Sequence, residues 1–153
     1  MKKDKVFAFF VCLACFFVVS LSANAIQFRR YNNTRFHFGC WVPTVLSQMS
    51  TSENNDGATF RRDSKTYLKV YGSYNAFDES IDGRFRSEVK SSDTYTLCKS
   101  NYFVRSGRSG RCIYYTKTVL RGEVFCTAYL CYPANEKWMF NGFVMYLFNN
   151  FPL

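Results

Sequence analysis

The second half of the chain is a succession of strand-like segments that ends in one broad apolar helix. From Thr94 onward, short stretches rich in Tyr, Val, Thr and Phe alternate with turn residues, which is typical of antiparallel strands. The last segment, residues 135–151, carries apolar residues around much of a helix, which indicates deep burial. Together they predict an α+β fold: an antiparallel β-sheet meander covered by helices, including a C-terminal helix.

The C-terminal helix is expected to supply the largest part of the core. Its apolar stripe consists of Phe140, Val144, Leu147 and Phe151, widened by Met139, Phe143 and Tyr146. Burial of such side chains contributes about 1.5 to 3 kcal/mol each. Asn135 is the expected helix cap. Truncation before Phe140 is therefore expected to unfold the domain.

The first half of the chain predicts a strand over residues 35–42 and a modest amphipathic helix over residues 77–91. Apolar residues alternate along the strand, so that one face is buried and His37 faces solvent. Along the helix, Ile81, Phe85 and Val89 recur at every fourth position. Between these two segments, short strands are expected over residues 58–61 and 66–71.

The first 25 residues match a secretory signal peptide. A basic start precedes an apolar run from Val6 to Leu21, and small residues stand before a cleavage point expected after Ala25. Residues 26–153 would then form a single α+β domain without a transmembrane segment. The expected location is periplasmic or secreted. The alternative is an uncleaved N-terminus that anchors the protein in the inner membrane.

The cysteine pattern does not indicate a metal site. Removal of the leader leaves an odd number of cysteines, namely Cys40, Cys98, Cys112, Cys126 and Cys131. These five cysteines include no CxxC pair, and a single histidine, His37, does not complete a zinc cluster. The sequence therefore predicts neither a metal nor another cofactor.

One pair of cysteines is a disulfide candidate. If Arg121 and Gly122 form a two-residue hairpin turn, Cys112 lies directly opposite Cys131. Opposed strand residues have Cα separations that a disulfide tolerates. The alternative is two reduced thiols packed as small apolar groups. In this register Cys126 is the better candidate for an unpaired thiol.

Several short motifs resemble a family of small exported bacterial proteins of unknown function. The motifs are Phe36–Pro43, Asn55–Phe60, Leu68–Asn75, Asn101–Gly107, Ile113–Lys117 and Tyr132-Pro133. The resemblance covers most of residues 35–151. It implies a PsbP-like fold, which also serves a photosynthetic accessory protein and a nuclear import factor.

These family motifs are signatures of turns and strands, so they imply a fold and not a reaction. Gly57 and Gly107 match positions where the family's backbone must turn tightly. The chain departs from the family pattern at its cysteines, where ordinary strand residues are expected. The resemblance therefore does not support a family-wide role for a disulfide.

Few groups in the sequence are suited to catalysis. Histidine is the usual general base, and His37 is the only one in the chain. The remaining candidates are a pair of His37 with Cys126 and the carboxylates of Asp78, Glu79, Asp82 and Glu88. No hydrolase, metalloprotease or nucleotide-binding motif is present. A small secreted enzyme with an unrecognised active site is the alternative function.

The chain is basic, with a formal net charge of +9, of which the leader carries +2 and residues 26–153 carry +7. The glycine-serine segment over residues 106–110 is expected to form a mobile connection between two strands. Arg105, Arg108 and Arg111 flank this segment and are the candidate binding residues. An ordinary solvated basic face is the competing interpretation. An exported protein rarely meets nucleic acid, so the expected partner is an envelope protein or an anionic surface component. The favoured function is a non-enzymatic binding or accessory protein of the cell envelope.

Overall fold

The structure, a computed structural model, describes residues 26–153. The predicted signal peptide, residues 1–25 with cleavage expected after Ala25, lies outside the described residues. Within residues 26–153 the fold is α+β, as the sequence predicts. Antiparallel strands form a sheet, and helices pack on it, among them a C-terminal helix.

The strands of the described chain form two antiparallel assemblies. A two-stranded ribbon pairs β1 (Phe28–Asn33) with β2 (Phe38–Pro43). Residues 48–133 contribute a seven-stranded sheet in the order β3-β4-β5-β9-β8-β7-β6. Its strands are β3 (Gln48–Thr51), β4 (Gly57–Arg61), β5 (Tyr67–Tyr74), β6 (Asp93–Cys98), β7 (Tyr102–Ser109), β8 (Cys112–Arg121) and β9 (Val124–Pro133). The chain builds β3 to β5, crosses to the far edge, and returns through a meander until β9 pairs with β5.

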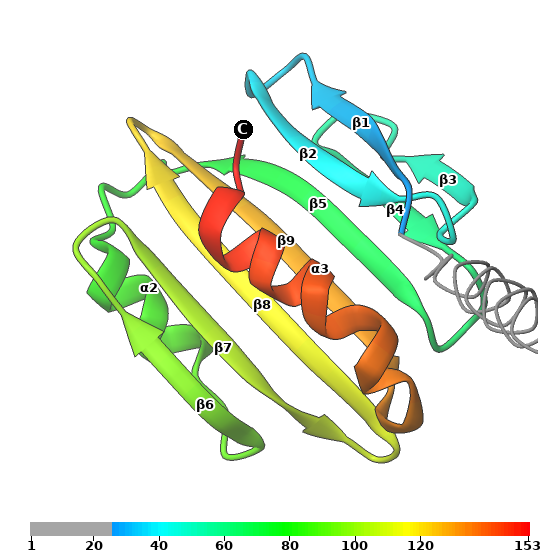
Figure 1. Cartoon of the computed structure of the whole chain (residues 1–153). Helices are drawn as coiled ribbons and strands as arrows, with labels where there is room; N and C mark the ends of the chain where they lie inside the picture. Colours follow the sequence, from blue (N-terminus) through cyan, green and yellow to red (C-terminus); the bar gives the residue numbers. More distant parts are fainter. Residues whose placement is uncertain (1–25) are drawn as a thin grey trace, which may run out of the picture.

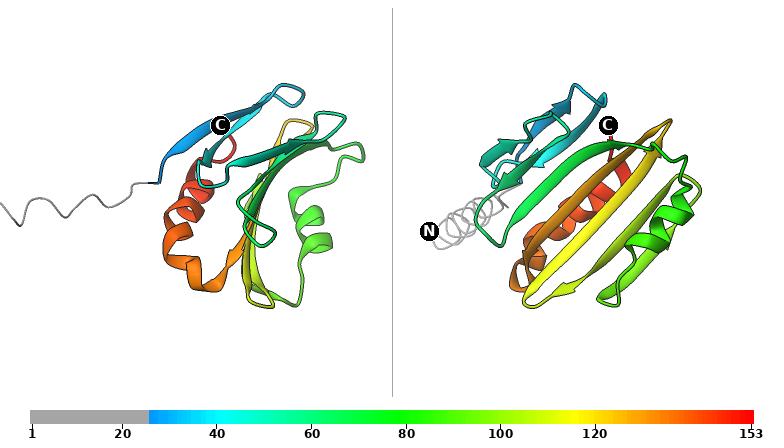
Figure 2. Two further views of the ribbon diagram at one scale, coloured as in Figure 1. Left: turned by 90° about the vertical axis from the view of Figure 1, so that its right-hand side faces the viewer. Right: turned by 180° about the vertical axis from the view of Figure 1, so that it is seen from behind.

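The helices cover the two faces of the sheet unequally. Helix α3 (Lys137–Asn150), preceded by the 3-10 turn η1 (Ala134–Glu136), lies along β8 and β9 on one face, with the β1–β2 ribbon beside β5 (Figure 1). The short helix α2 (Ile81–Glu88) lies on the opposite face (Figure 2). The main hydrophobic core lies between the sheet and α3, and a smaller cluster lies under α2.

Helix α3 buries most of the apolar stripe that the sequence predicts. Phe140, Phe143 and Leu147 are each 0% exposed, and Phe151, just beyond the helix, is 2% exposed. The predicted cap is wrong. Asn135 lies inside η1, and no side-chain hydrogen bond caps the start of α3.

A buried lysine on β8 holds the other end of α3. The Lys117 Nζ donates hydrogen bonds to the carbonyl oxygens of Leu147 and Phe148, at 3.4 and 2.5 Å. Carbonyl groups in the last turn of a helix have no partner within the helix and carry partial negative charge, so a cation stabilises them. Burial lowers the pKa of Lys117.

Helix α2 is shorter than the helix predicted over residues 77–91. Ser80 caps its N-terminus by accepting a hydrogen bond from the backbone N–H of Gly83 at 3.0 Å. Ile81 is buried, as predicted. Val89 is 44% exposed because the helix ends before it.

Strand β2 begins later than the strand predicted over residues 35–42. His37 has a φ of 51°, in the left-handed region, within the turn that joins β1 to β2. The side chain of His37 is exposed, as predicted. The alternate positions expected to be buried are indeed buried, namely Phe36, Phe38, Cys40 and Val42.

Gly57 and Gly107 lie within β4 and β7, and not at tight turns as the family resemblance implies. A Cβ added to Gly57 would lie 2.3 Å from the carbonyl oxygen of Val70. One added to Gly107 would lie 2.2 Å from the carbonyl oxygen of Ser92. Both positions need glycine because another stretch of backbone passes close to them.

Gly57→Ala is expected to lower the free energy of unfolding by about 1–3 kcal/mol, because the new methyl group forces β4 and β5 apart. Gly142→Ala in α3 is the matched control, since nothing lies within 4 Å of a Cβ at that position. There, alanine is expected to raise the free energy of unfolding by about 0.5–1 kcal/mol. Urea unfolding measures both values. A Gly57→Ala protein as stable as the parent would contradict the close approach.

Candidate functional site

A cleft of about 580 Å³ opens at the end of the sheet where β7 turns into β8 and where β9 leaves the sheet. We call it the basic cleft. Its lining consists of Lys65, Arg108, Gly110, Arg111, Cys112 and residues 133–136. Lys65 comes from the loop between β4 and β5. The pairing of β5 with β9, which sets Tyr67 opposite Cys131, brings this loop to the same end of the sheet.

A two-residue turn positions the arginines of the basic cleft. Ser109 pairs with Cys112, so that only Gly110 and Arg111 connect β7 to β8. Gly110 has a φ of 59°, which glycine adopts without strain. The sequence-based prediction of a mobile connection over residues 106–110 is wrong, because β7 continues to Ser109. Arg108, near the end of β7, and Arg111 in the turn are both exposed.

The basic cleft carries an excess of positive charge. Among residues 26–153, no carboxylate lies within ion-pair distance of Lys65, Arg108 or Arg111. The acidic residue of the lining, Glu136, is already paired with Arg62 at 2.8 Å. Three cations at one mouth therefore have no internal counter-ion, which is the electrostatic condition for attracting an anion.

The structure does not bring the third predicted arginine to the basic cleft. Arg105 lies opposite Thr116 in the sheet and is 5% exposed, whereas Arg108 projects from the other face. The Arg105 guanidinium lies 3.2 Å from the Asp93 carboxylate and 3.6 Å from that of Glu88. Arg105 also donates a hydrogen bond to the backbone carbonyl of Glu88. Arg105 is therefore a structural ion-pair partner and does not contribute to the candidate binding site.

Asp93 is the centre of this buried network. Burial alone would raise the pKa of its carboxyl group, but hydrogen bonds from Tyr114 and the Lys90 backbone, together with Arg105, hold that pKa below its usual value. The Tyr114 hydroxyl donates to Asp93 at 2.6 Å. Burial and this hydrogen bond raise the pKa of Tyr114. The network joins β6, β7 and β8 on the face that carries α2.

The predicted register of the β8–β9 hairpin is wrong by two residues. Arg121 pairs with Val124, so the turn consists of Gly122 and Glu123. Gly122 has a φ of 57° and is the first residue of the turn, where type II′ hairpin turns place glycine. Consequently Cys112 lies opposite Pro133.

A shift of two residues preserves the alternation of faces, so Cys112 and Cys131 still lie on one face of the sheet, as diagonal neighbours. Both thiols are free, as are the other cysteines of residues 26–153. Burial raises the pKa of Cys131, and the nearby Cys112 raises it further. The structure therefore contains two neighbouring reduced thiols, of which Cys112 lines the basic cleft. The predicted direct opposition of Cys112 and Cys131 is absent.

The structure does not bring the histidine and cysteine considered for catalysis into one site. His37 is exposed in the β1–β2 turn, whereas Cys126 is 1% exposed in the core opposite Val119. Burial raises the pKa of Cys126 to about 11, so its thiol stays protonated at neutral pH. Such a thiol is a packing group and not an activated nucleophile.

Three of the four acidic residues considered for catalysis form ion pairs around α2, whereas Asp78 is exposed and forms none within residues 26–153. Glu79 and Glu88 both approach Arg84, at 3.6 and 2.7 Å, and Asp82 pairs with Arg86 one helical turn away. Within residues 26–153, no group of three or more His, Cys, Asp or Glu side chains is placed to hold a metal ion. No helix in the same range combines the length and hydropathy needed to span a bilayer.

Sequence reasoning did not identify Lys65 as part of the site. Its loop is more than forty residues from the β7–β8 turn, and only the pairing of β5 with β9 places the two together. The one signal in the sequence was the turn motif Asp63-Ser64-Lys65, which places a lysine at a sheet end. It did not specify which end.

Comparison with known proteins supports the fold and does not identify a function. No protein-family model matches the chain, and no curated protein is significantly similar to it. The solution structure of cyanobacterial PsbP (CyanoP) from Synechocystis sp. PCC 6803 is similar, with a TM-score of 0.59 and 11% sequence identity. The match covers 82% of this chain and 91% of that one. The chain therefore has a PsbP-like α+β fold.

Proposed function

We propose that the chain is an exported, periplasmic protein that binds an anionic component of the cell envelope and performs no catalysis itself. The observation that carries this proposal is the basic cleft, where Lys65, Arg108 and Arg111 converge without an internal counter-ion. The leader pattern that ends at Ala25 supports export. The PsbP-like fold is compatible with many tasks and does not select among them.

The chemistry of the cleft favours phosphate or carboxylate groups as its ligands. Arg108 and Arg111 present planar guanidinium groups that match such oxygens in pairs, and Lys65 adds a mobile point charge. A protein that reaches an envelope surface would use such a site for docking. The exposed position of all three cations allows contact with a large partner as well as with a small anion.

Retention on immobilised heparin tests the role of the cleft. The variant Lys65→Gln/Arg108→Gln/Arg111→Gln is expected to elute in dilute salt, whereas the parent protein requires a higher concentration. Each lost contact with an anionic group removes about one unit from the slope of log affinity against log salt. The salt concentration at elution is the measurement.

A charge-matched variant makes the heparin test specific. Arg30→Gln/Lys90→Gln/Lys99→Gln removes three exposed cations that lie outside the lining of the basic cleft. Because both variants have the same net charge, any difference in elution comes from the position of the charges. We expect this control to elute close to the parent protein. Equal elution of the two variants would show that the basic residues form an ordinary solvated face.

A further inference from the structure

A second cavity, separate from the basic cleft, lies between α3 and the β6–β7 edge of the sheet. Its volume is about 310 Å³, and its lining is Tyr95, Ser106, Tyr115, Val144, Met145 and Phe148. Helix α3 runs along β8 and β9 on this face, and the ribbons of β7 and β6 lie to its side (Figure 1). Tyr95 lies opposite Ser106, and Ser106 lies opposite Tyr115, so these three residues form a row that is the cavity floor.

One residue of the lining, Tyr115, has a buried hydroxyl group without a hydrogen-bond partner. Tyr115 is 3% exposed, and its hydroxyl oxygen makes no hydrogen bond within the described residues. Buried polar groups are nearly always hydrogen-bonded, because removal of such a group from water without compensation is costly. Phenylalanine would fill the same space without this cost. The hydroxyl group therefore needs an explanation beyond packing.

The rest of the lining defines the chemistry of a ligand. Val144, Met145 and Phe148 form an apolar wall on α3, and no side chain of the lining carries a charge. A charged group would lose its hydration there without gaining a partner, so the lining selects against ions. At about 30 Å³ for each water-sized group, a cavity of 310 Å³ holds about ten non-hydrogen atoms.

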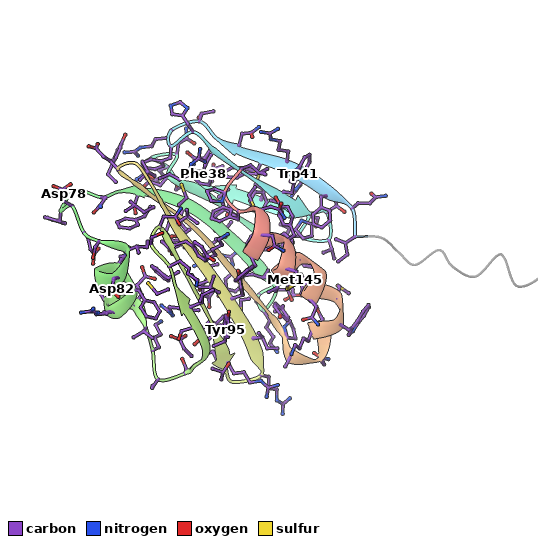
Figure 3. The ribbon with its side chains drawn as sticks, turned by 60° about the vertical axis from the view of Figure 1, so that its left-hand side comes forward. Phe38, Trp41, Asp78, Asp82, Tyr95 and Met145 are labelled. Carbon is purple, nitrogen blue, oxygen red and sulfur yellow. The ribbon has the colours of Figure 1, made fainter. Side chains whose placement is uncertain are left out.

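Two exposed side chains border the mouth of the cavity. Met145 on α3 is 57% exposed, and Tyr95 on β6 is 50% exposed. Figure 3 labels the two residues, one on the helix and the other on the side of the strands. The Tyr115 hydroxyl is shielded from water, so a ligand must displace a covering side chain to reach it. Methionine is unbranched and changes its side-chain conformation readily, so Met145 is suited to move aside when a ligand enters.

We propose that this cavity binds an uncharged amphipathic molecule, whose single hydroxyl or carbonyl oxygen accepts a hydrogen bond from Tyr115. The hydrocarbon part of the ligand lies between α3 and β6, against Val144, Met145 and Phe148. The bound ligand satisfies the buried hydroxyl group of Tyr115, which lacks a partner within the described residues. This inference rests on the cavity alone and is independent of the proposed role of the basic cleft.

Titration of the protein with 1-octanol, followed by methyl NMR, tests the proposal. The methyl signals of Val144 and Met145 are expected to shift in the parent protein. Tyr115→Phe keeps the ring and removes only the hydroxyl group, so its affinity for 1-octanol is expected to fall about three- to tenfold. The midpoint of thermal unfolding of the free variant is expected to rise, because an unpaired buried group has been removed.

The combination of weaker binding with greater stability separates a ligand-binding role from a structural one. Tyr132→Phe is the matched control, since Tyr132 is a buried tyrosine on the same face of the sheet and outside the cavity lining. Its affinity for 1-octanol is expected to equal that of the parent protein. Absence of shifts at Val144 and Met145, or unchanged affinity in Tyr115→Phe, would overturn the proposal.

Discussion

A chain that ends at Met139 is expected to be unfolded in water. It lacks Phe140, Phe143 and Leu147, which are fully buried against the sheet, and it lacks Phe151 beyond the helix. The loss of four such side chains, at about 1.5 to 3 kcal/mol each, is comparable with the whole stability of a small domain. Far-ultraviolet circular dichroism would show an unfolded spectrum for the truncated chain and an α+β spectrum for the full chain.

A single substitution in α3 is expected to lower the stability of the protein without unfolding it completely. Phe143→Ala is expected to lower the free energy of unfolding by about 3–5 kcal/mol, through lost burial and the cavity that remains. Trp138→Ala removes a larger aromatic group from the same helix, but Trp138 is 76% exposed. Its effect is expected to stay within about 0.5 kcal/mol. Similar losses in the two variants would contradict the packing of α3 on the sheet.

Arg105→Met is expected to destabilise the protein by about 3–5 kcal/mol at neutral pH. The side chains of Arg105 and Asp93 are 6% and 2% exposed, so the substitution leaves a carboxylate buried without its counter-ion. Arg86→Met is the matched control, because the side chains of the Arg86–Asp82 pair are 76% and 54% exposed and such pairs contribute little. Guanidinium unfolding of both variants measures the difference. Equal effects would show that Arg105 has no special structural role.

The pH dependence of the Arg105→Met variant gives a second readout. In the parent protein the pKa of Asp93 is held below 3.8, so its contribution to stability is present above that value and lost as the pH falls below it. In the variant, burial without Arg105 raises the pKa of Asp93, so the cost of the buried charge disappears when the pH falls. The difference in stability between parent and variant is therefore expected to shrink from pH 7 to pH 4. A difference that is independent of pH would contradict this cause.

The strands that the sequence predicted correctly have alternating or continuous apolar residues, because burial on one face leaves such a pattern. Two strands lack it. All four residues of β3 are exposed, and β1 is mostly polar, so neither has the signature of a buried face. Each pairs with the next strand along the chain, β1 with β2 and β3 with β4, through backbone hydrogen bonds, which do not require an apolar face.

The candidate site was predicted only in part, because the alignment of the strands decides which arginines reach it. Arg108 and Arg111 flank a recognisable turn, and the turn places both at the basic cleft. The sequence alone did not separate Arg105 from them, because its ion pair with Asp93 depends on the alignment of β6 with β7. A bulge between Asp93 and Tyr95 shifts that alignment, and short motifs do not encode such shifts.

Amide chemical-shift mapping with a heparin-derived oligosaccharide shows where on the surface an anionic partner binds, and so tests whether the basic cleft is the binding site. The largest shifts are expected at the basic cleft, in the amides of Lys65, Arg108 and residues 110–112. Small shifts are expected around α2, where Arg84 and Arg86 are already paired with carboxylates. Shifts spread evenly over the basic surface, or centred away from the cleft, would contradict binding at the cleft.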